Sequence, residues 1–199
     1  MRIIAGAYRG RRLKTLRGRE VRPTSDKLRE TLFNILRPEV PGSVFLDCYA
    51  GSGAVGLEAL SRGAAQVFLI ERDPVAARVI EENIMALGER NTTALGVSPE
   101  SGGKARILRA DVQAGLRKLA AQGVRAGICF IDPPYALLGE ALRNLSWLCE
   151  SSQSSLMRPE GVIILEHSRK DSPHEQIGDW VRSRLLQQGS SALSFYRKE

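Results

Sequence analysis

The alternation of short apolar segments with helix-like segments constrains the fold of this 199-residue chain more than any other feature. Apolar runs of strand length occupy residues 44–48, 66–71, 105–110, 128–131 and 161–166. Helical periodicity is found between them, over residues 54–62, 74–87, 112–122 and 137–149. Nearly continuous apolar strands separated by amphipathic helices are typical of a parallel sheet that is covered on both faces. The sequence therefore predicts an α/β fold around a mostly parallel sheet.

The N-terminal region differs from this pattern. Residues 2–5 and 11–16 predict a small hairpin, although the second segment is highly charged. Thr24 or Ser25 can cap a helix that runs to Leu36, and the prolines that follow stop this helix. We therefore expect a hairpin and one helix to precede the alternating strands and helices.

The C-terminal region also breaks the alternation. Residues 180–187 and 192–197 flank a Gly-Ser turn and predict a closing antiparallel hairpin. Residues 91–104 contain glycine and proline without periodicity, which indicates a surface insertion. We expect two parts, a basic extension over residues 1–40 and a larger domain over residues 41–199.

The net charge of +7 is concentrated at one end of the chain. Residues 1–40 contain 11 basic and 4 acidic side chains, whereas the other 159 residues contain 18 of each. A basic extension beside a neutral body is typical of a polyanion-binding protein, in which phosphate contacts supply affinity. The alternative is a charged surface that only favours solubility. We predict nucleic-acid contacts through Arg9, Arg11, Arg12, Lys14, Arg22 and Thr24.

The cysteines and histidines do not form the pattern of a metal site or a disulfide. Cys48, Cys129 and Cys149 are widely spaced in apolar sequence, and no Cys lies at ligand spacing from His167 or His174. No apolar run approaches the roughly 18–20 residues of a membrane helix, and the N-terminus lacks the apolar core of a signal peptide. These observations predict a cytoplasmic protein without a metal or a membrane partner.

A glycine-rich loop follows the first apolar strand and opens a helix. Gly51, Gly53 and Gly56 have the G-x-G-x-x-G spacing of dinucleotide enzymes, and Glu71 lies where a ribose-binding carboxylate is expected. This pattern fits a nicotinamide oxidoreductase. However, the charge of Asp47 beside the loop disfavours a pyrophosphate and suits the ammonium group of S-adenosylmethionine. We therefore favour a methyltransferase and keep the oxidoreductase as an alternative.

The tetrapeptide Asp132-Pro133-Pro134-Tyr135 follows another apolar strand. An exocyclic amine of a nucleobase is a poor nucleophile, because its lone pair is delocalised into the ring. The carboxylate of Asp132 and the carbonyl of Pro133 could accept the amine hydrogens, while Tyr135 stacks on the base. The alternative is a turn that only ends the strand, as consecutive prolines commonly do. Because open α/β sheets bind ligands at the carboxyl ends of their strands, the position favours a catalytic role.

These two motifs are accompanied by a series of further motifs that carry a family resemblance. They are Arg2-Ile3-Ile4-Ala5-Gly6, Arg22-Pro23-Thr24-Ser25-Asp26, Arg29-Glu30, Leu32-Phe33-Asn34-Ile35-Leu36 and Leu60-Ser61-Arg62-Gly63-Ala64. With them the chain resembles the RsmD family of bacterial 16S rRNA (guanine-N2) methyltransferases, from Met1 to about Lys198. Tyr49 departs from the family, which usually has Phe there, and the tail lacks the Tyr-Gly that is usual before the last strand.

The resemblance implies a Rossmann-like, class I S-adenosylmethionine-dependent methyltransferase fold with a seven-stranded sheet. It implies that the substrate is one guanine of 16S rRNA, in the small ribosomal subunit or its assembly intermediate. We expect the protein to be a monomer. Glu71 with Arg72 would bind the cofactor's ribose and Asp111 its adenine amine, although Glu71 could instead favour the start of the next helix. The methionine end of the cofactor would contact Asp47, Tyr49, Ala50, Gly51, Ser52 and Gly53.

Two further functions remain open on the sequence. The same tetrapeptide serves enzymes that methylate adenine N6 in DNA or RNA. A non-catalytic RNA-binding assembly factor could have kept the fold. The intact Asp132, Glu71 and Gly51 argue against the second alternative.

Overall fold

The structure is a computed structural model, and it describes four stretches of the chain: residues 1–16, 26–88, 105–150 and 156–199. Arg22, Thr24, Ser25 and the segment 91–104 lie outside the described residues.

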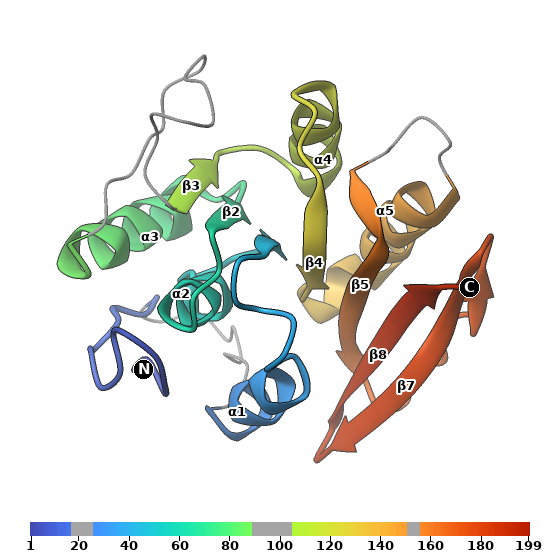
Figure 1. Cartoon of the computed structure of the whole chain (residues 1–199), viewed down its shortest axis with the longest axis horizontal. Helices are drawn as coiled ribbons and strands as arrows, with labels where there is room; N and C mark the ends of the chain where they lie inside the picture. The colour runs from blue at the N-terminus through green and yellow to red at the C-terminus, as the bar shows by residue number, and fades with distance from the viewer. Residues whose placement is uncertain (17–25, 89–104, 151–155) are drawn as a thin grey trace.

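The described strands form one eight-stranded sheet in the order β3-β2-β1-β4-β5-β8-β7-β6 (Figure 1). Neighbouring strands from β3 to β5 are parallel, and the pairs β5–β8, β8–β7 and β7–β6 are antiparallel. The strands are β1 (Val44–Cys48), β2 (Gln66–Ile70), β3 (Ala105–Leu108), β4 (Ala126–Ile131), β5 (Met157–Ser168), β6 (Gln176–Ile177), β7 (Trp180–Gln188) and β8 (Ser191–Lys198).

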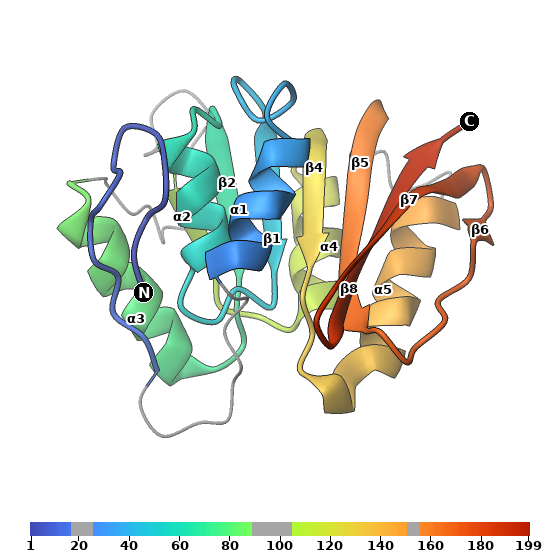
Figure 2. The same cartoon turned by 90° about the horizontal axis from the view of Figure 1, so that it is seen from below.

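Helices cover both faces of the sheet, with α1, α2 and α3 on one side and α4 and α5 on the other (Figures 1 and 2). No helix of the described residues is long and apolar enough to cross a membrane. The helices are α1 (Asp26–Ile35), α2 (Ala54–Ser61), α3 (Pro74–Ala86), α4 (Val112–Ala121) and α5 (Leu138–Glu150), with a short 3-10 turn η1 (Tyr135–Leu137).

Each face of the sheet has its own hydrophobic core. Phe45, Phe130 and Ile164 belong to the core under α1–α3, whereas Cys48 and Ile131 belong to the core under α4 and α5. Alternate residues of one strand therefore enter opposite cores, as the two-residue period of a strand requires. Because both faces are buried at the centre of the sheet, β1, β2 and β4 are apolar along most of their length, which is the property that made them recognisable in the sequence.

The predicted α/β fold with its parallel strands, alternating helices and closing hairpin is confirmed. The sheet has one strand more than the seven that the family resemblance implied, because the two-residue β6 pairs with β7. The predicted N-terminal hairpin is reduced to an isolated bridge between Arg2 and Arg12. The amides of Ile3, Gly10 and Leu13 donate across the turn to the carbonyls of Arg11, Ile3 and Met1, each over 3.0 Å. Ile3 and Leu13 are buried, while the arginines of residues 1–16 are exposed.

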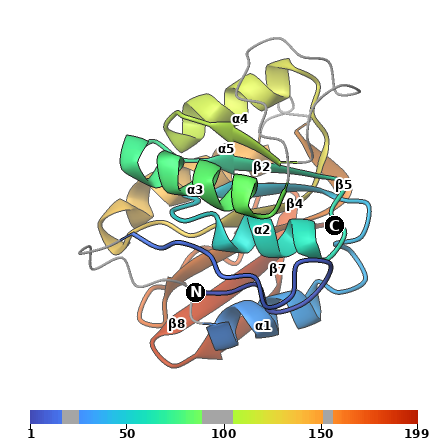
Figure 3. The same ribbon diagram turned by 90° about the vertical axis from the view of Figure 1, so that its left-hand side faces the viewer.

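The N-terminal segment, residues 1–16, lies along α2 (Figure 3). Hydrogen bonds to the side chains and the backbone of α2 fix it there. The amides of Ile4 and Ala5 donate to Glu58 over 2.7 and 3.0 Å. The amide of Tyr8 donates to Ser61 Oγ over 2.9 Å. Gly6 adopts φ +86°, and a Cβ there would lie 1.9 Å from the carbonyl oxygen of Ser61, so this approach requires glycine.

Glu58 is fully buried and binds two arginines in addition to these amides. Arg62 Nε donates to Glu58 Oε1 over 2.7 Å, and its guanidinium lies 5.0 Å from the ring centroid of Phe33. Arg29 Nε is 3.8 Å from Glu58 Oε2, and Arg29 Nη2 donates to the carbonyl of Arg2. Burial lowers the pKa of Arg29, and the negative charge of Glu58 opposes this shift. One carboxylate thus joins α1, α2 and the N-terminal segment.

Glu58→Ala should lower the free energy of unfolding by about 3–5 kcal/mol, because the buried Arg29 loses its nearest buried carboxylate. Glu82→Ala is the matched control, since Glu82 forms an exposed salt bridge with Lys14 and should cost less than about 1 kcal/mol. Equilibrium denaturation in urea measures both values. Equal small losses in the two variants would show that Glu58 does not hold the segment.

Candidate active site

A cavity of about 760 Å³ lies at the carboxyl ends of the parallel strands. Its lining includes the whole tetrapeptide from Asp132 to Tyr135, together with Asp47, Gly51 and Glu71. The two motifs, 79 positions apart in the sequence, therefore share one site. The parallel pairing of β1 with β4 explains this, because it brings the ends of both strands to the same edge of the sheet.

The glycine-rich loop turns sharply between β1 and α2. Tyr49, Gly51 and Gly53 have φ values of 64°, 58° and 77°, in the left-handed region that glycine enters without strain. Tyr49 is the only such non-glycine residue in the described chain. Its hydroxyl donates to Glu140 Oε1 over 2.9 Å and accepts from Asn144 Nδ2 over 3.0 Å, so α5 holds the side chain in place.

Burial and the neighbouring Glu140 raise the pKa of Tyr49. The Tyr49 hydroxyl is therefore a neutral hydrogen-bonding group. Glu140 Oε2 also lies 3.8 Å from Arg72 Nη1, and both Tyr49 and Arg72 line the cavity. The Tyr49 hydroxyl, which the usual Phe lacks, thus joins the glycine-rich loop to α5, the helix that follows the tetrapeptide.

Glu71 connects the glycine-rich loop to the start of α3. Its Oε2 accepts from the amide of Gly51 and its Oε1 from the amide of Asp73, both over 2.8 Å. Asp73 is the N-cap of α3 and accepts from the amide of Val75. One carboxylate therefore supports both the glycine-rich loop and the start of α3, which is the second role considered for Glu71 in the sequence, while its ribose-binding role stays a prediction.

Asp47 lies inside the sheet edge with 2% of its surface exposed. Its Oδ2 accepts from the amide of Gly56, in the first turn of α2, over 2.8 Å. A Cβ on residue 56 would lie 3.0 Å from that oxygen, so the third glycine of the motif makes room for the carboxylate. Burial, with smaller contributions from Asp132 and Glu71, raises the pKa of Asp47 well above its ordinary value, and the Gly56 bond opposes this. Burial thus disfavours the charged form of Asp47, and a cation next to the carboxylate would stabilise that form.

The tetrapeptide leaves β4 directly at the cavity. The amide of Asp132 donates to the carbonyl of Cys48 over 3.3 Å, so the register of the sheet extends to this residue. Pro133 is buried, and the amide of Leu137 donates to the carbonyl of Pro134, which closes η1. Tyr135 has 62% of its surface exposed. The carboxylate of Asp132 in the cavity lining and the exposed ring of Tyr135 suit a base that enters from solvent.

Asn83 is a site residue that sequence reasoning did not select. Its Oδ1 accepts from the amide of Lys14 over 2.7 Å, and its Nδ2 donates to the carbonyls of Lys14 and Ser52 over 3.1 and 2.9 Å. The buried side chain of Asn83 thus joins the N-terminal segment to the glycine-rich loop. The next two residues of that segment, Thr15 and Leu16, line the cavity. An isolated Asn on the buried face of a helix offers no recognisable pattern.

The remaining predicted residues lie around the cavity or away from it. Asp111 is exposed and caps α4 by accepting from the amide of Ala114 over 2.9 Å, while its neighbours Ala110 and Val112 line the cavity. The cavity lining also includes Ala50 and Ser52, and Gly53 forms the N-cap of α2.

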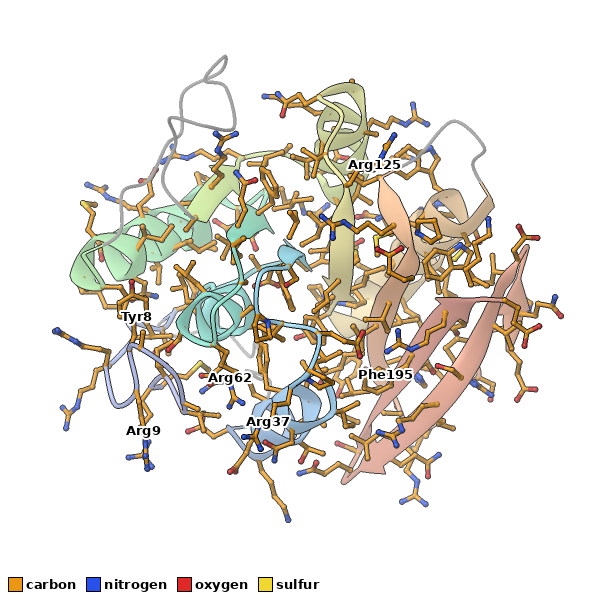
Figure 4. All side chains as sticks on the ribbon, in the orientation of Figure 1. Tyr8, Arg9, Arg37, Arg62, Arg125 and Phe195 are labelled. Atoms are coloured by element: carbon orange, nitrogen blue, oxygen red, sulfur yellow. The ribbon has the colours of Figure 1, made fainter. Side chains whose placement is uncertain are left out.

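The basic residues of the N-terminal segment are all exposed where the structure describes them. Arg9 points away from the body of the protein (Figure 4), and Arg11 and Arg12 are exposed in the same segment. Lys14 Nζ forms an exposed salt bridge with Glu82 over 2.9 Å. The predicted phosphate-binding residues therefore lie at the surface of a segment whose next residues, Thr15 and Leu16, reach the cavity.

Asp47→Asn should stabilise the ligand-free protein, with an effect that grows with pH. An unfolded Asp titrates near pH 3.9, and the pKa of folded Asp47 is higher. As the pH rises between these two values the unfolded chain loses its proton first, so wild-type stability falls across this window. Because Asn does not titrate, the Asp47→Asn variant does not lose stability at this position as the pH rises. Urea denaturation from pH 4 upwards measures the difference, with the exposed Asp179→Asn as control; a constant difference would contradict the buried-carboxylate argument.

Comparison with known proteins agrees with this geometry. A family model described as "Conserved hypothetical protein 95" matches residues 1–197. The chain is 34% identical over 204 residues to ribosomal RNA small subunit methyltransferase D of Escherichia coli K12, covering 100% of this chain and 90% of that protein. It is 33% identical over 197 residues to the protein of the same name from Haemophilus influenzae, covering 99% and 92%. A solved structure of a hypothetical protein from Thermus thermophilus matches with a TM-score of 0.78 and 33% identity, covering 99% of both chains. The chain therefore belongs to the RsmD family and has its methyltransferase fold.

Proposed function

We propose that this protein transfers a methyl group from S-adenosylmethionine to the exocyclic N2 amine of a guanine in 16S rRNA. The observation that carries the proposal is the shared cavity, which contains both the Asp132–Tyr135 tetrapeptide and the glycine-rich loop. The relatives named ribosomal RNA small subunit methyltransferase D support rRNA as the substrate. Such a substrate also accords with a cytoplasmic protein.

The residues of the loop fit a cofactor with a cationic end and a ribose. Asp47 is a carboxylate whose pKa is raised by burial, and an ammonium group would stabilise its charged form directly or through a water. Glu71 presents a carboxylate beside Gly51, where ribose hydroxyls can be bound. Bound S-adenosylmethionine would supply a methyl group on a positively charged sulfur, whose C–S bond breaks as the N–C bond forms, with the electron pair remaining on sulfur.

The tetrapeptide would prepare the amine for attack. The carboxylate of Asp132 and the carbonyl of Pro133 accept the two amine hydrogens, which draws the nitrogen lone pair out of the ring. Tyr135 stacks on the base, an interaction worth about 1–3 kcal/mol. The proton lost by nitrogen passes to Asp132 or to solvent. The acceleration comes from holding the amine in line and excluding water, because no covalent enzyme intermediate is needed.

Residues 1–40 would act as an RNA-binding extension of the methyltransferase domain, which spans residues 41–199. Three arginines of this extension, Arg9, Arg11 and Arg12, are exposed, and the segment continues into the cavity wall at Thr15. Phosphate contacts there would place a flipped base beside Tyr135 without reading the sequence. The substrate would be the small ribosomal subunit or its assembly intermediate.

Two observations weigh against the alternative functions. A nicotinamide cofactor would bring a pyrophosphate next to the buried Asp47, which disfavours an oxidoreductase. A non-catalytic assembly factor has no need of an acceptor and an exposed aromatic ring in one cavity. The adenine-N6 alternative uses the same tetrapeptide, and only the product distinguishes it.

The product of the reaction tests the proposal directly. Incubation with labelled S-adenosylmethionine and small subunits from a strain that lacks this protein should yield labelled N2-methylguanosine on nucleoside analysis. Asp132→Ala should reduce turnover by about 100-fold or more, while calorimetry shows cofactor affinity within a few-fold, since one well-placed group contributes about 3–4 kcal/mol to such a transition state. Labelled N6-methyladenosine, or binding of NAD in place of S-adenosylmethionine, would refute the proposal.

The salt dependence of RNA binding tests the N-terminal segment. Replacing Arg9, Arg11 and Arg12 by Ala should weaken binding and flatten the plot of log affinity against log salt by about 2–3 units, at roughly 0.7–0.9 per lost phosphate contact. Cofactor affinity should not change, because none of these side chains lines the cavity.

A control variant removes three exposed basic side chains from α4 and α5, on the opposite face of the sheet: Arg117, Lys118 and Arg143. It has the same net charge as the triple arginine variant and should keep the wild-type slope. An equal slope change in both variants would indicate a general charge effect and would leave the N-terminal segment without a specific role.

A further inference from the structure

Four carboxylates follow one another along the carboxyl edge of the sheet. Glu71 follows β2, Asp47 lies near the end of β1, Asp132 follows β4, and Glu166 lies near the end of β5. The sheet order places these strands next to each other as β2-β1-β4-β5. The first three have roles in the proposed reaction. Glu166 has none.

The register of the sheet places Glu166 beside Asp132. Ile131 of β4 pairs with Leu165 of β5, so the next residue of each strand occupies the same level. Adjacent parallel strands are about 4.8 Å apart. The backbones of Asp132 and Glu166 are therefore neighbours at the edge of the sheet.

Both side chains also belong to the same face. Phe130 and Ile164 lie in the core under α1–α3, and the two-residue period of a strand brings Asp132 and Glu166 to that face again. Both residues line the cavity. Among the described residues, no group of three His, Cys, Asp or Glu side chains is arranged to hold a metal ion, so this row does not have the geometry of a metal site.

The position of Glu166 is on the substrate side of the site. The glycine-rich loop follows β1, and β4 separates β1 from β5. Glu166 is thus one strand further from the cofactor loop than Asp132, the residue that would contact the amine. A group bound by Glu166 would belong to the base itself, on the side of the amine away from the cofactor.

We propose that Glu166 accepts the N1–H of the target guanine while Asp132 accepts an N2–H, so that Glu166 determines the choice of guanine. This inference rests on the proposed guanine-N2 activity. Guanine carries the N1–H and N2–H donors on adjacent atoms of its Watson–Crick edge, which matches two neighbouring carboxylates. Adenine has an acceptor at N1 beside its amine, and that lone pair would face the Glu166 carboxylate with no hydrogen between them. A buried acceptor without its donor rejects a substrate strongly.

The test compares guanine with 2-aminopurine at the methylated position of the rRNA, which is located by mapping the labelled RNA fragments. 2-Aminopurine keeps the N2 amine but has an acceptor at N1. In single-turnover assays the wild-type protein should methylate guanine about 100-fold faster than 2-aminopurine. Glu166→Gln should slow guanine methylation and speed 2-aminopurine methylation about 10-fold, because its amide can donate to N1. The ratio of the two rates cancels the effect of the missing O6, which is common to both proteins.

Glu160→Gln is the matched control, since Glu160 is exposed on the same strand and should keep the wild-type preference. Equal wild-type rates on guanine and 2-aminopurine would overturn the inference without any variant, even if Glu166→Gln failed to fold. A folded Glu166→Gln protein that keeps the wild-type ratio would also overturn it. If the wild-type protein forms no N2-methylguanosine from any rRNA, the proposed function itself fails, and this outcome is distinct from the other two.

Discussion

The burial of Asp47 is the constraint on which the rest of the site depends. The carboxylate is held at the edge of a sheet covered on both faces, where water cannot stabilise its charge. Its bond to Gly56 fixes the start of α2, and the missing side chain of that glycine gives it room. The charged form of Asp47 therefore carries an electrostatic cost that a bound cation would offset. Such a site is destabilising by itself and selective for what it binds, a trade-off that is common in functional sites.

Two side chains connect this centre to the segments that would contact the substrate. Asn83 joins the N-terminal segment to the carbonyl of Ser52, and the Tyr49 hydroxyl joins the glycine-rich loop to α5 through Glu140. Both contacts use polar groups that are at least partly buried, where an unpaired partner is costly. The loop, the exposed arginines and the tetrapeptide are thus parts of one connected framework. These contacts hold the residues of the framework in position, and such positioning is what catalysis by orientation requires.

The row of carboxylates explains how one sheet edge can serve both ligands. Four neighbouring parallel strands each contribute one acidic side chain to the same cavity near the carboxyl edge of the sheet. Burial raises the pKa of Asp47, and the nearby charges of Asp132 and Glu71 raise it further. A cationic cofactor and a base that presents hydrogen-bond donors both complement this edge. A pyrophosphate does not, so the glycine spacing alone does not identify the cofactor.

The sequence by itself determined the features that depend on neighbours along the chain. Apolar runs and helical periodicity predicted the strands and helices of the β/α repeat, and the glycine-rich loop and the Asp132–Tyr135 tetrapeptide were recognisable as contiguous motifs. The tertiary structure decided which distant residues meet. Asn83 binds Lys14, 69 positions away, and Tyr49 binds Glu140, 91 positions away. Glu166 reaches the cavity through the register between β4 and β5. The register of two strands, or a contact between two distant segments, depends on how the elements pack against each other. No local sequence pattern identifies such a contact.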